Sequence, residues 1–197
     1  MQVDIEKVQA FFDRLAATWD DDREAKDDVI GEILDRAGIE AGCTVLDVAC
    51  GTGVLFPYYL ERNVGHLTGI DLSPEMIRVA GEKYRDSRLT LLTGDVEEAP
   101  LGMYDRIVIF NAFPHFPDPQ RLIAALSAHL NPGGRLTVAH DRSRFAINGH
   151  HEQTATEVSM GLSPAETVAE WFGKHLAVDI AIDDDWHYVV SGVKKED

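Results

Sequence analysis

A glycine loop between two apolar segments is the part of this sequence best suited to hold a ligand. Gly51 and Gly53 follow the apolar segment Val45–Val48, and Asp71 ends the next apolar segment. Glycine lets a ligand approach the backbone closely, and a carboxylate about 20 residues past the loop can accept hydrogen bonds from ribose hydroxyls. A helix starting near Gly53 would direct unpaired N–H groups at a carboxylate or phosphate. Together these residues predict a nucleotide pocket.

Two absences narrow the class of ligand. The dinucleotide fingerprint requires a third small residue three positions beyond the second glycine, where this chain has Phe56, so NAD is disfavoured. No G-x-x-x-x-G-K-[ST] segment occurs, so the lysine and hydroxyl that hold a triphosphate and magnesium are missing too. The class that remains is a nucleoside ligand without phosphate groups.

Five segments identify a family when taken in order. They are VLDVACGTG at 45–53, GIDLSPEM at 69–76, TGDV at 93–96, YDRIVIFN at 104–111 and LNPGGRL at 130–136. With these segments the chain resembles the class I S-adenosylmethionine-dependent methyltransferases, in the small-molecule branch that includes the ubiquinone and menaquinone biosynthesis C-methyltransferases. The resemblance covers most of the chain. It implies an enzyme with a Rossmann-like methyltransferase fold that transfers a methyl group from S-adenosyl-L-methionine to O, S, N or C of a small molecule.

The resemblance also implies roles for residues around the cofactor. Asp47 would orient the methionine end through the glycine loop and water, because an ionised carboxylate in a buried strand needs partners. An internal hydrogen bond is the alternative for Asp47. Asp71 would accept from the ribose hydroxyls, and Asp95 from the adenine amino group, with turn capping as the alternative for Asp95.

Other residues complete the predicted cofactor site. Leu72 and Met76 would pack on the adenine faces, with core packing as the alternative for Met76. The Val96 N–H would reach the adenine ring, and the main chain at Asn111 and Ala112 would meet the ammonium group. The predicted cofactor residues are therefore Asp47, Ala49, Gly51, Gly53, Asp71, Leu72, Met76, Asp95, Val96, Asn111 and Ala112.

Four of the eight histidines are expected on one side of the fold: His115, His140, His150 and His151. They follow the fourth and fifth predicted strands, and the carboxyl ends of parallel strands form the binding crevice. Histidine is the side chain whose pKa is nearest to the pH at which enzymes act. At least one of the four is therefore predicted to act as a general base or to bind polar groups of the acceptor. Each could instead be a structural residue. With Asp141 and Glu152 the group also has ligand types for a divalent metal, but no H-E-x-x-H spacing supports this and no metal ligand is assigned.

Charge and hydropathy exclude several classes of partner. The formal net charge of −16 opposes nucleic-acid binding, which depends on Lys and Arg neutralising phosphates. Apolar runs are far shorter than the roughly 18 residues of a membrane span, and charges at Asp4, Glu6 and Lys7 interrupt any export signal, so a cytoplasmic protein is expected. The acidic clusters at 20–22 and 183–185 are expected to be solvated surface. Cys43 and Cys50, about 23 Å apart along an extended strand, cannot form a disulfide.

Strand and helix patterns alternate from residue 44 onward, which predicts an α/β fold with a doubly wound, mostly parallel sheet. Five strands are expected at 44–49, 66–70, 88–92, 105–110 and 134–140, and a C-terminal antiparallel hairpin over 178–193 brings the sheet to seven strands. Helices are expected near 24–37, 53–63, 74–85 and 119–130. Ser73 and Asp118 precede prolines and predict helix caps, and Ser163 with Glu166 predicts a capping box for a helix to about 174.

A single domain is expected over residues 1–197, with two additions that cover the site. Apolar residues from Ile5 to Trp19 recur at steps of three and four, which predicts an amphipathic lid helix within 1–22. Packing on the outside of the sheet is the alternative for that helix. Residues 141–162 form an irregular, histidine-rich insert after the fifth strand, over the crevice.

Two other functions stay open besides a methyltransferase. The pocket could serve a non-catalytic S-adenosylmethionine-binding sensor or partner module, and the histidines could support a metal-assisted methyltransferase. A nucleoside-cofactor oxidoreductase is weakened by Phe56. The sequence leaves the acceptor, the acceptor atom, the oligomeric state and the pathway undetermined.

Overall fold

The computed structural model describes residues 3–21, 26–154 and 157–195, with residues 151–154 described by their backbone alone. The element order is α1 (Ile5–Leu15), a 3-10 helix (Ala16–Thr18), α2 (Asp27–Arg36), β1 (Thr44–Val48), α3 (Phe56–Glu61), β2 (His66–Asp71), α4 (Pro74–Lys83), β3 (Leu89–Thr93), β4 (Tyr104–Phe110), a 3-10 helix (Phe113–His115), α5 (Pro119–Ala128), β5 (Leu130–His140), α6 (Arg144–Thr154), α7 (Ala165–Phe172), β6 (Leu176–Asp183) and β7 (Tyr188–Lys194).

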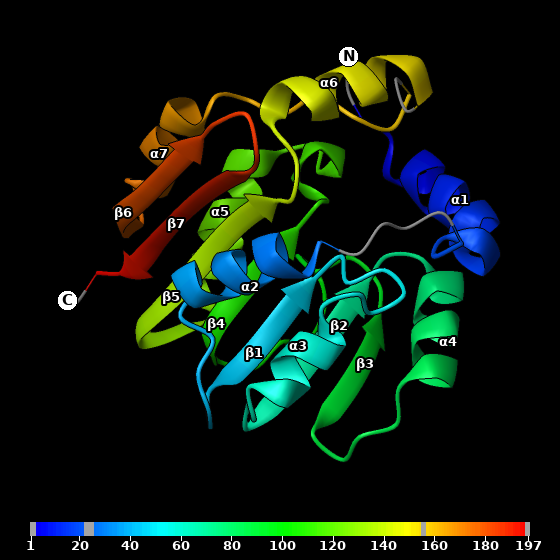
Figure 1. Cartoon of the computed structure of the whole chain (residues 1–197), viewed down its shortest axis with the longest axis horizontal. Coiled ribbons are helices and arrows are strands. Elements are labelled where there is room, and N and C mark those ends of the chain that lie inside the picture. Colours follow the sequence, from blue (N-terminus) through cyan, green and yellow to red (C-terminus); the bar gives the residue numbers. More distant parts are fainter. Residues whose placement is uncertain (1–2, 22–25, 155–156, 196–197) are drawn as a thin grey trace.

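All seven strands form one sheet in the order β3-β2-β1-β4-β5-β7-β6 (Figure 1). Strands β1 to β5 are parallel, and β7 pairs antiparallel with both β5 and β6. The predicted doubly wound, mostly parallel seven-stranded sheet with a C-terminal antiparallel hairpin is confirmed. The strand order reverses between β1 and β4, which are neighbours through pairs such as Leu46 and Ile107. A ligand crevice is therefore expected at the carboxyl ends of these two strands.

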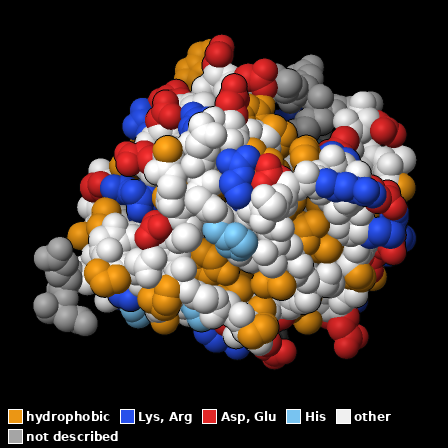
Figure 2. All heavy atoms as spheres, turned by 90° about the horizontal axis from the view of Figure 1, so that it is seen from below, with side chains coloured by type: hydrophobic (Ala, Val, Ile, Leu, Met, Phe, Trp, Pro, Cys, Tyr) orange, Lys and Arg blue, Asp and Glu red, His pale blue; other side chains and the backbone are white. Residues whose placement is uncertain are grey.

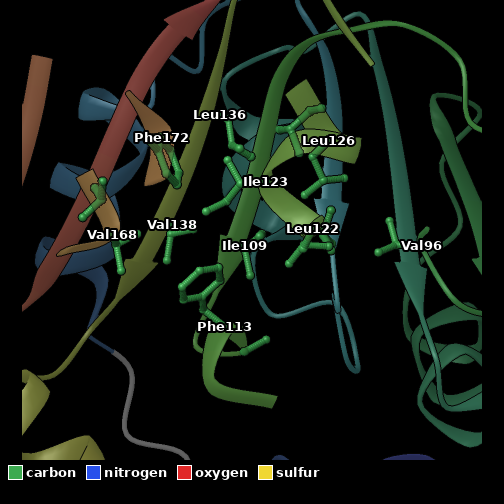
Figure 3. Close-up of a cluster of buried hydrophobic side chains, with 14 of the residues drawn as sticks. Val96, Ile109, Phe113, Leu122, Ile123, Leu126, Leu136, Val138, Val168 and Phe172 are labelled. Carbon is green, nitrogen blue, oxygen red and sulfur yellow. The ribbon is translucent and has the colours of Figure 1, made fainter. Parts of the chain in front are cut away.

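Helices cover both faces of the sheet because neighbouring strand residues point to opposite sides. Leu46 and Ile107 belong to a core with α5 and α7, and Val45 and Val108 to a second core with α2, α3 and α4. Figure 3 shows the first core, in which side chains of α5 and α7 meet those of β4 and β5. The two cores hold the strands rigidly, so the loops at their carboxyl ends start from fixed positions.

Two of the three predicted helix caps are confirmed. The Ser73 hydroxyl accepts from the Met76 N–H at 3.1 Å, and the Asp118 carboxylate accepts from the Arg121 N–H at 3.0 Å. The capping box at Ser163 is wrong, because the residue before α7 is Pro164 with no side-chain cap. The carboxylate of Asp183, from the neighbouring strand β6, instead accepts from the first N–H of that helix at 3.4 Å.

The predicted irregular insert at 141–162 contains a helix, α6, and the expectation of irregular structure there is wrong. Contacts with distant segments hold this helix. Arg144 forms an ion pair with Asp183 at 2.6 Å. The side-chain amide of Asn148 accepts a hydrogen bond from the Leu162 N–H at 2.6 Å and donates one to the Leu162 carbonyl at 3.1 Å. Because these partners lie elsewhere in the sequence, the polar local pattern gave no sign of the helix. Figure 1 shows α6 at the top, above the carboxyl ends of the strands.

The surface of the described residues is mixed in chemical character. No helix there combines the length and apolarity needed to cross a bilayer. Figure 2 shows the face at the amino ends of the parallel strands, where acidic, basic and hydrophobic side chains are interspersed. Cys43 and Cys50 are free thiols, as expected.

Candidate functional site

A cavity of about 740 Å³ lies at the carboxyl ends of β1 to β5, a size typical of small-molecule sites. Its walls come from α1 and Trp19, from the ends of the five parallel strands and the loops that follow them, from the residue before α2 and from α6. Ten of the eleven predicted cofactor residues line it, the exception being Gly53. His115, His140 and His150 line the same cavity. The topology thus brings the two predicted groups of residues to one place.

The loop after β1 is held against β2 by backbone hydrogen bonds. The Cys50 N–H donates to the Ile70 carbonyl at 3.0 Å, and the Gly51 N–H donates to Asp71 Oδ2 at 2.8 Å. Ala49 and Gly51 have φ of 54° and 55°, in the left-handed region that glycine tolerates best. The space beside Gly51 is open, since an added Cβ would meet its first neighbour, Trp19 Nε1, at 3.9 Å. This opening is where a ligand can lie against the backbone.

Gly53 does not line the cavity, so the geometry does not support its predicted contact with the cofactor. Its φ is 83°, and an added Cβ would lie 2.5 Å from the Phe56 ring and 2.9 Å from the Tyr84 ring. Glycine is needed here so that the loop can turn against these rings. The helix expected to start near Gly53 is α3, which begins at Phe56. Its first N–H groups therefore lie farther along the chain than predicted.

Asp71 lies at the end of β2 and is 9% exposed. Its Oδ2 accepts from the Gly51 N–H, and its Oδ1 accepts from the Ser73 N–H, both at 2.8 Å. Burial raises the pKa of Asp71 to about 6, although the two backbone hydrogen bonds act in the opposite direction. Each carboxylate oxygen has a second lone pair, so the group can still accept from two hydroxyls of a ligand. Its predicted role at the ribose is compatible with this geometry.

Asp47 lies at the base of the cavity and is 2% exposed. Its Oδ2 has no hydrogen-bond donor among the described residues. Burial, and secondarily the charge of Asp71, raises the pKa of Asp47 well above its ordinary value. A buried acceptor without a donor is costly unless a ligand or water satisfies it. The structure therefore leaves a place for the predicted contact with the methionine end of a cofactor.

The remaining predicted cofactor residues form the adjacent wall. Asp95 accepts from the Glu97 N–H at 2.9 Å, so it caps a turn and still faces the cavity. Met76 is 1% exposed, which means that it is a core residue whose edge reaches the cavity wall. Asn111, with φ of 55°, exchanges two hydrogen bonds with Asp141, at 3.0 and 3.1 Å. These bonds connect the carboxyl ends of β4 and β5.

Three of the four predicted histidines face one cavity, and the side chain of His151 lies outside the described residues. His140 ends β5, is buried, and has its ring edge-on to Tyr188 with centroids 5.8 Å apart. His150 is exposed and lies on α6, on the same side as Ala146, one turn earlier. His115 follows β4, is partly buried and has its ring beside that of Phe12. The three rings therefore differ in depth and environment.

His115 has the geometry of a base held in one tautomer. Its Nδ1 is 2.7 Å from the Val158 carbonyl oxygen, which can only accept, so Nδ1 carries the proton and the lone pair is on Nε2. The ring is edge-on to Phe12 with centroids 5.1 Å apart. Burial lowers the pKa of His115, which the Val158 hydrogen bond opposes only in part. The imidazole is thus kept neutral near neutral pH.

The described residues contain no group of three side chains placed to hold a metal ion. His151 and Glu152, two members of the group considered from the sequence, have side chains outside the described part. The acidic cluster at 183–185 is partly engaged, since Asp183 pairs with Arg144 and Asp184 accepts from the N–H groups of Trp186 and His187. No metal ligand is assigned.

The N-terminal segment, which was predicted to form a lid, lines the cavity. Its lining side chains are Ile5, Val8, Phe11, Phe12, Leu15 and Trp19. Asp13 accepts from the Ser73 hydroxyl at 2.5 Å, and Asp20 accepts from the Thr52 hydroxyl at 2.8 Å and pairs with Lys83 at 2.7 Å. These bonds fasten the lid to the loops that follow β1 and β2, beside the predicted cofactor residues.

Sequence reasoning missed three cations in the cavity wall: Lys26, Arg121 and Arg142. Arg142 follows His140 and Asp141 at the end of β5. Because ligands bind at the carboxyl ends of parallel strands, the reasoning that predicted His140 in the crevice could also have predicted Arg142 there. Lys26 stands at the start of α2, before the first strand, and no local signal places it near the crevice. Only the fold brings it to the Asp141 carbonyl, 2.7 Å from its Nζ.

Comparison with known proteins gives a family match over part of the chain. Residues 45–134 match the model of a methyltransferase domain. The chain is 35% identical over 109 residues to a ribosomal protein L11 methyltransferase of Dechloromonas aromatica (55% of this chain, 35% of that protein), and 37% identical over 105 residues to a ubiquinone biosynthesis O-methyltransferase of Xylella fastidiosa (50% and 42%). It is 27% identical over 186 residues to a malonyl-[acyl-carrier protein] O-methyltransferase of Anoxybacillus flavithermus (88% and 70%). The chain thus spans less than half of the first two relatives.

Solved structures share the fold across nearly the whole chain. The N-methyltransferase NodS of Bradyrhizobium japonicum, in complex with S-adenosyl-l-homocysteine, superposes with a TM-score of 0.75 at 18% identity and covers 96% of this chain and 99% of its own. The [4+2]-cyclase SpnF superposes with a TM-score of 0.79 at 15% identity, over 98% and 97%. At these identities the likeness shows the fold alone, and the second neighbour shows that this fold also carries other chemistry.

Proposed function

We propose that this chain, as a member of the S-adenosylmethionine-dependent methyltransferase family through its domain at 45–134, is an enzyme. In this proposal it transfers a methyl group to a small-molecule acceptor. The observation that carries the proposal is one cavity with two kinds of wall. The loops after β1, β2 and β3 supply the predicted nucleoside-binding groups, and β4, β5 and α6 supply the histidines. A cytoplasmic location is part of the proposal.

The residues present fit the cofactor of this family. The open backbone at Gly51 and the buried acceptor Asp47 Oδ2 support contacts with its methionine chain, and the remaining lone pairs of Asp71 support contacts with its ribose. When bound, S-adenosylmethionine supplies a methyl group on a positively charged sulfur. Such a transfer needs the acceptor atom held about 3–3.5 Å from the methyl carbon and in line with the carbon–sulfur bond.

The protein's own contribution is positioning, exclusion of water and one proton transfer. The lid residues Phe12 and Trp19 shield the cavity, which removes competing water. His115 Nε2 can take the proton that an acceptor phenol, thiol or ring carbon loses as its electron pair forms the new bond to carbon. In this proposal His140 and His150, which also line the cavity, contact other polar groups of the acceptor.

Calorimetry with S-adenosylhomocysteine tests the proposal. We expect a dissociation constant in the micromolar range, about −8 kcal/mol, because the predicted contacts are mostly hydrogen bonds to a preformed pocket. NAD serves as the control ligand and should give no comparable binding. Tighter binding of NAD would favour the oxidoreductase, whereas binding of the methyl donor without methyl transfer to any acceptor would favour the sensor.

Deleting residues 1–19 should leave a folded protein with a weakened acceptor site. The lid packs in a small cluster of its own, with Val3, Val8 and Val158, apart from the two cores beside the sheet. Losing one buried aromatic side chain removes roughly 1.5–3 kcal/mol of apolar contact, so the KM for the acceptor should rise at least about tenfold. Circular dichroism checks folding and steady-state kinetics give KM. An unfolded truncated chain would show that the lid is part of the core.

A further inference from the structure

The half of the cavity beyond the cofactor loops carries positive charge. Lys26 lines it from the start of α2, and Arg142 lines it from the segment after β5. The predicted cofactor contacts come mainly from β1, β2 and β3, on the other side of the reversal in strand order. In the proposed enzyme the two cations would therefore face the acceptor.

Neither cation has a carboxylate partner among the described residues. Arg142 is exposed and makes no hydrogen bond or ion pair with that part of the chain, and Lys26 uses one of its three N–H groups on the Asp141 carbonyl. The third cation of the wall, Arg121, differs because it pairs with Glu97 at 2.7 Å.

The nearest described carboxylate in the sequence does not neutralise them. Asp141 Oδ1 accepts from the Asn111 side chain at 3.0 Å, and the part of Asp141 that meets Lys26 is its backbone carbonyl. His150, on the adjacent helix α6, also lines the cavity. An anionic group entering here would meet Arg142 and Lys26 without displacing an ion pair of these two residues within the described part of the chain.

Apolar groups also line this half. The lid reaches it through Phe12, whose ring is edge-on to that of His115 with centroids 5.1 Å apart. The helix α6 contributes Ala146 and Ile147. A ligand that satisfies both walls has an apolar or aromatic body and an anionic oxygen-bearing group.

We propose that the methyl acceptor is such a molecule, with a carboxylate or phosphate held by Arg142 and Lys26 and an aromatic or apolar body against the lid. Both anions have the oxygen geometry that a guanidinium binds through two parallel hydrogen bonds. This inference rests on the proposed function, because it assigns the acceptor side of the same cavity. Attraction to the cations also offsets the repulsion that a chain of net charge −16 exerts on an anion.

The test uses the full chain saturated with S-adenosylhomocysteine and three fluorescent probes of one shape: 2-naphthoate, 2-naphthyl phosphate and 2-naphthylmethanol. At least one anionic probe should bind about tenfold to a hundredfold more tightly than the neutral alcohol, because charge-assisted hydrogen bonds are lost with the alcohol. Comparing the two anions distinguishes carboxylate from phosphate. The preference should shrink as salt is added.

Arg142→Gln should remove most of the preference for the anion and leave the affinity for the neutral alcohol unchanged. Arg85→Gln is the matched control, because Arg85 is exposed and outside the cavity wall. Equal binding of all three probes, no binding of either anion, or an anion preference that survives Arg142→Gln together with Lys26→Gln would overturn the inference. Failure to bind S-adenosylhomocysteine at the outset would instead count against the proposed function.

Discussion

Replacing His115 by alanine is expected to lower kcat by about 10²–10⁴ and to leave the affinity for S-adenosylhomocysteine nearly unchanged. The Val158 carbonyl fixes the proton on Nδ1, so the lone pair of the neutral ring is on Nε2, and His115 lines the cavity. Single-turnover kinetics and calorimetry on the same variant separate these two quantities. The effect requires an acceptor that loses a proton on methylation.

Two further variants separate catalysis from support of the fold. Asparagine at position 115 can still donate to the Val158 carbonyl but has no basic lone pair, so His115→Asn should be nearly as inactive as His115→Ala. If His115 only holds the segment at Val158, asparagine should restore activity. His66→Ala is the control, because His66 is at the amino end of β2 and outside the cavity wall. Full activity of His115→Ala would transfer the role of base to another histidine.

The pH profile gives an independent readout of the same residue. Burial holds the pKa of His115 below its ordinary value of 6.5, and a base must be neutral to act. Activity should therefore be constant near neutral pH and fall as pH decreases through a value below about 6.5. An activity that rises on acidification would exclude His115 as the base.

Replacing Asp71 by alanine is expected to weaken binding of S-adenosylhomocysteine about tenfold to a hundredfold, because hydrogen bonds to a charged acceptor contribute roughly 1.5–3 kcal/mol. The wild-type affinity should also depend on pH. Since the pKa of Asp71 is raised to about 6, the carboxylate is ionised at pH 7.5 and increasingly protonated below 6. Affinity should fall as pH falls through this range.

Asp71→Asn is the matched control for that pH dependence. Asparagine keeps the size of the side chain and cannot titrate, so the part of the pH dependence due to Asp71 should disappear, while any part due to Asp47 stays. Thermal unfolding of both variants must be measured too, because Asp71 also holds the Gly51 and Ser73 N–H groups. Unchanged affinity in Asp71→Ala would remove this residue from the cofactor site.

Protonation of Asp71 at lower pH should affect the stability of the fold in the opposite direction to its effect on cofactor binding. The folded chain holds a proton on Asp71 at higher pH than the unfolded chain does, because its folded pKa is raised above 3.8. This group therefore stabilises the fold more as pH falls from above 6 toward 4. Stability and cofactor affinity should thus respond in opposite directions to the titration of this one carboxylate.

The sequence alone determined the elements that short-range physics controls. The alternation of apolar strands with helices, the proline-preceding caps at Ser73 and Asp118, and the glycine loop beside Asp71 all depend on residues a few positions apart. Since parallel strands place their carboxyl ends at one edge, strand order was enough to bring His115 and His140 to the same cavity as the glycine loop.

Only the tertiary structure decided the features that join distant parts of the chain. His115 is oriented by Val158, 43 residues away, and Lys26 reaches the Asp141 carbonyl across 115 residues. Helix α6 forms in a segment without clear periodicity because Arg144 and Asn148 find partners in β6 and in the loop before α7. Such contacts depend on how loops run and how elements pack, and a local pattern of residue types contains no information about either.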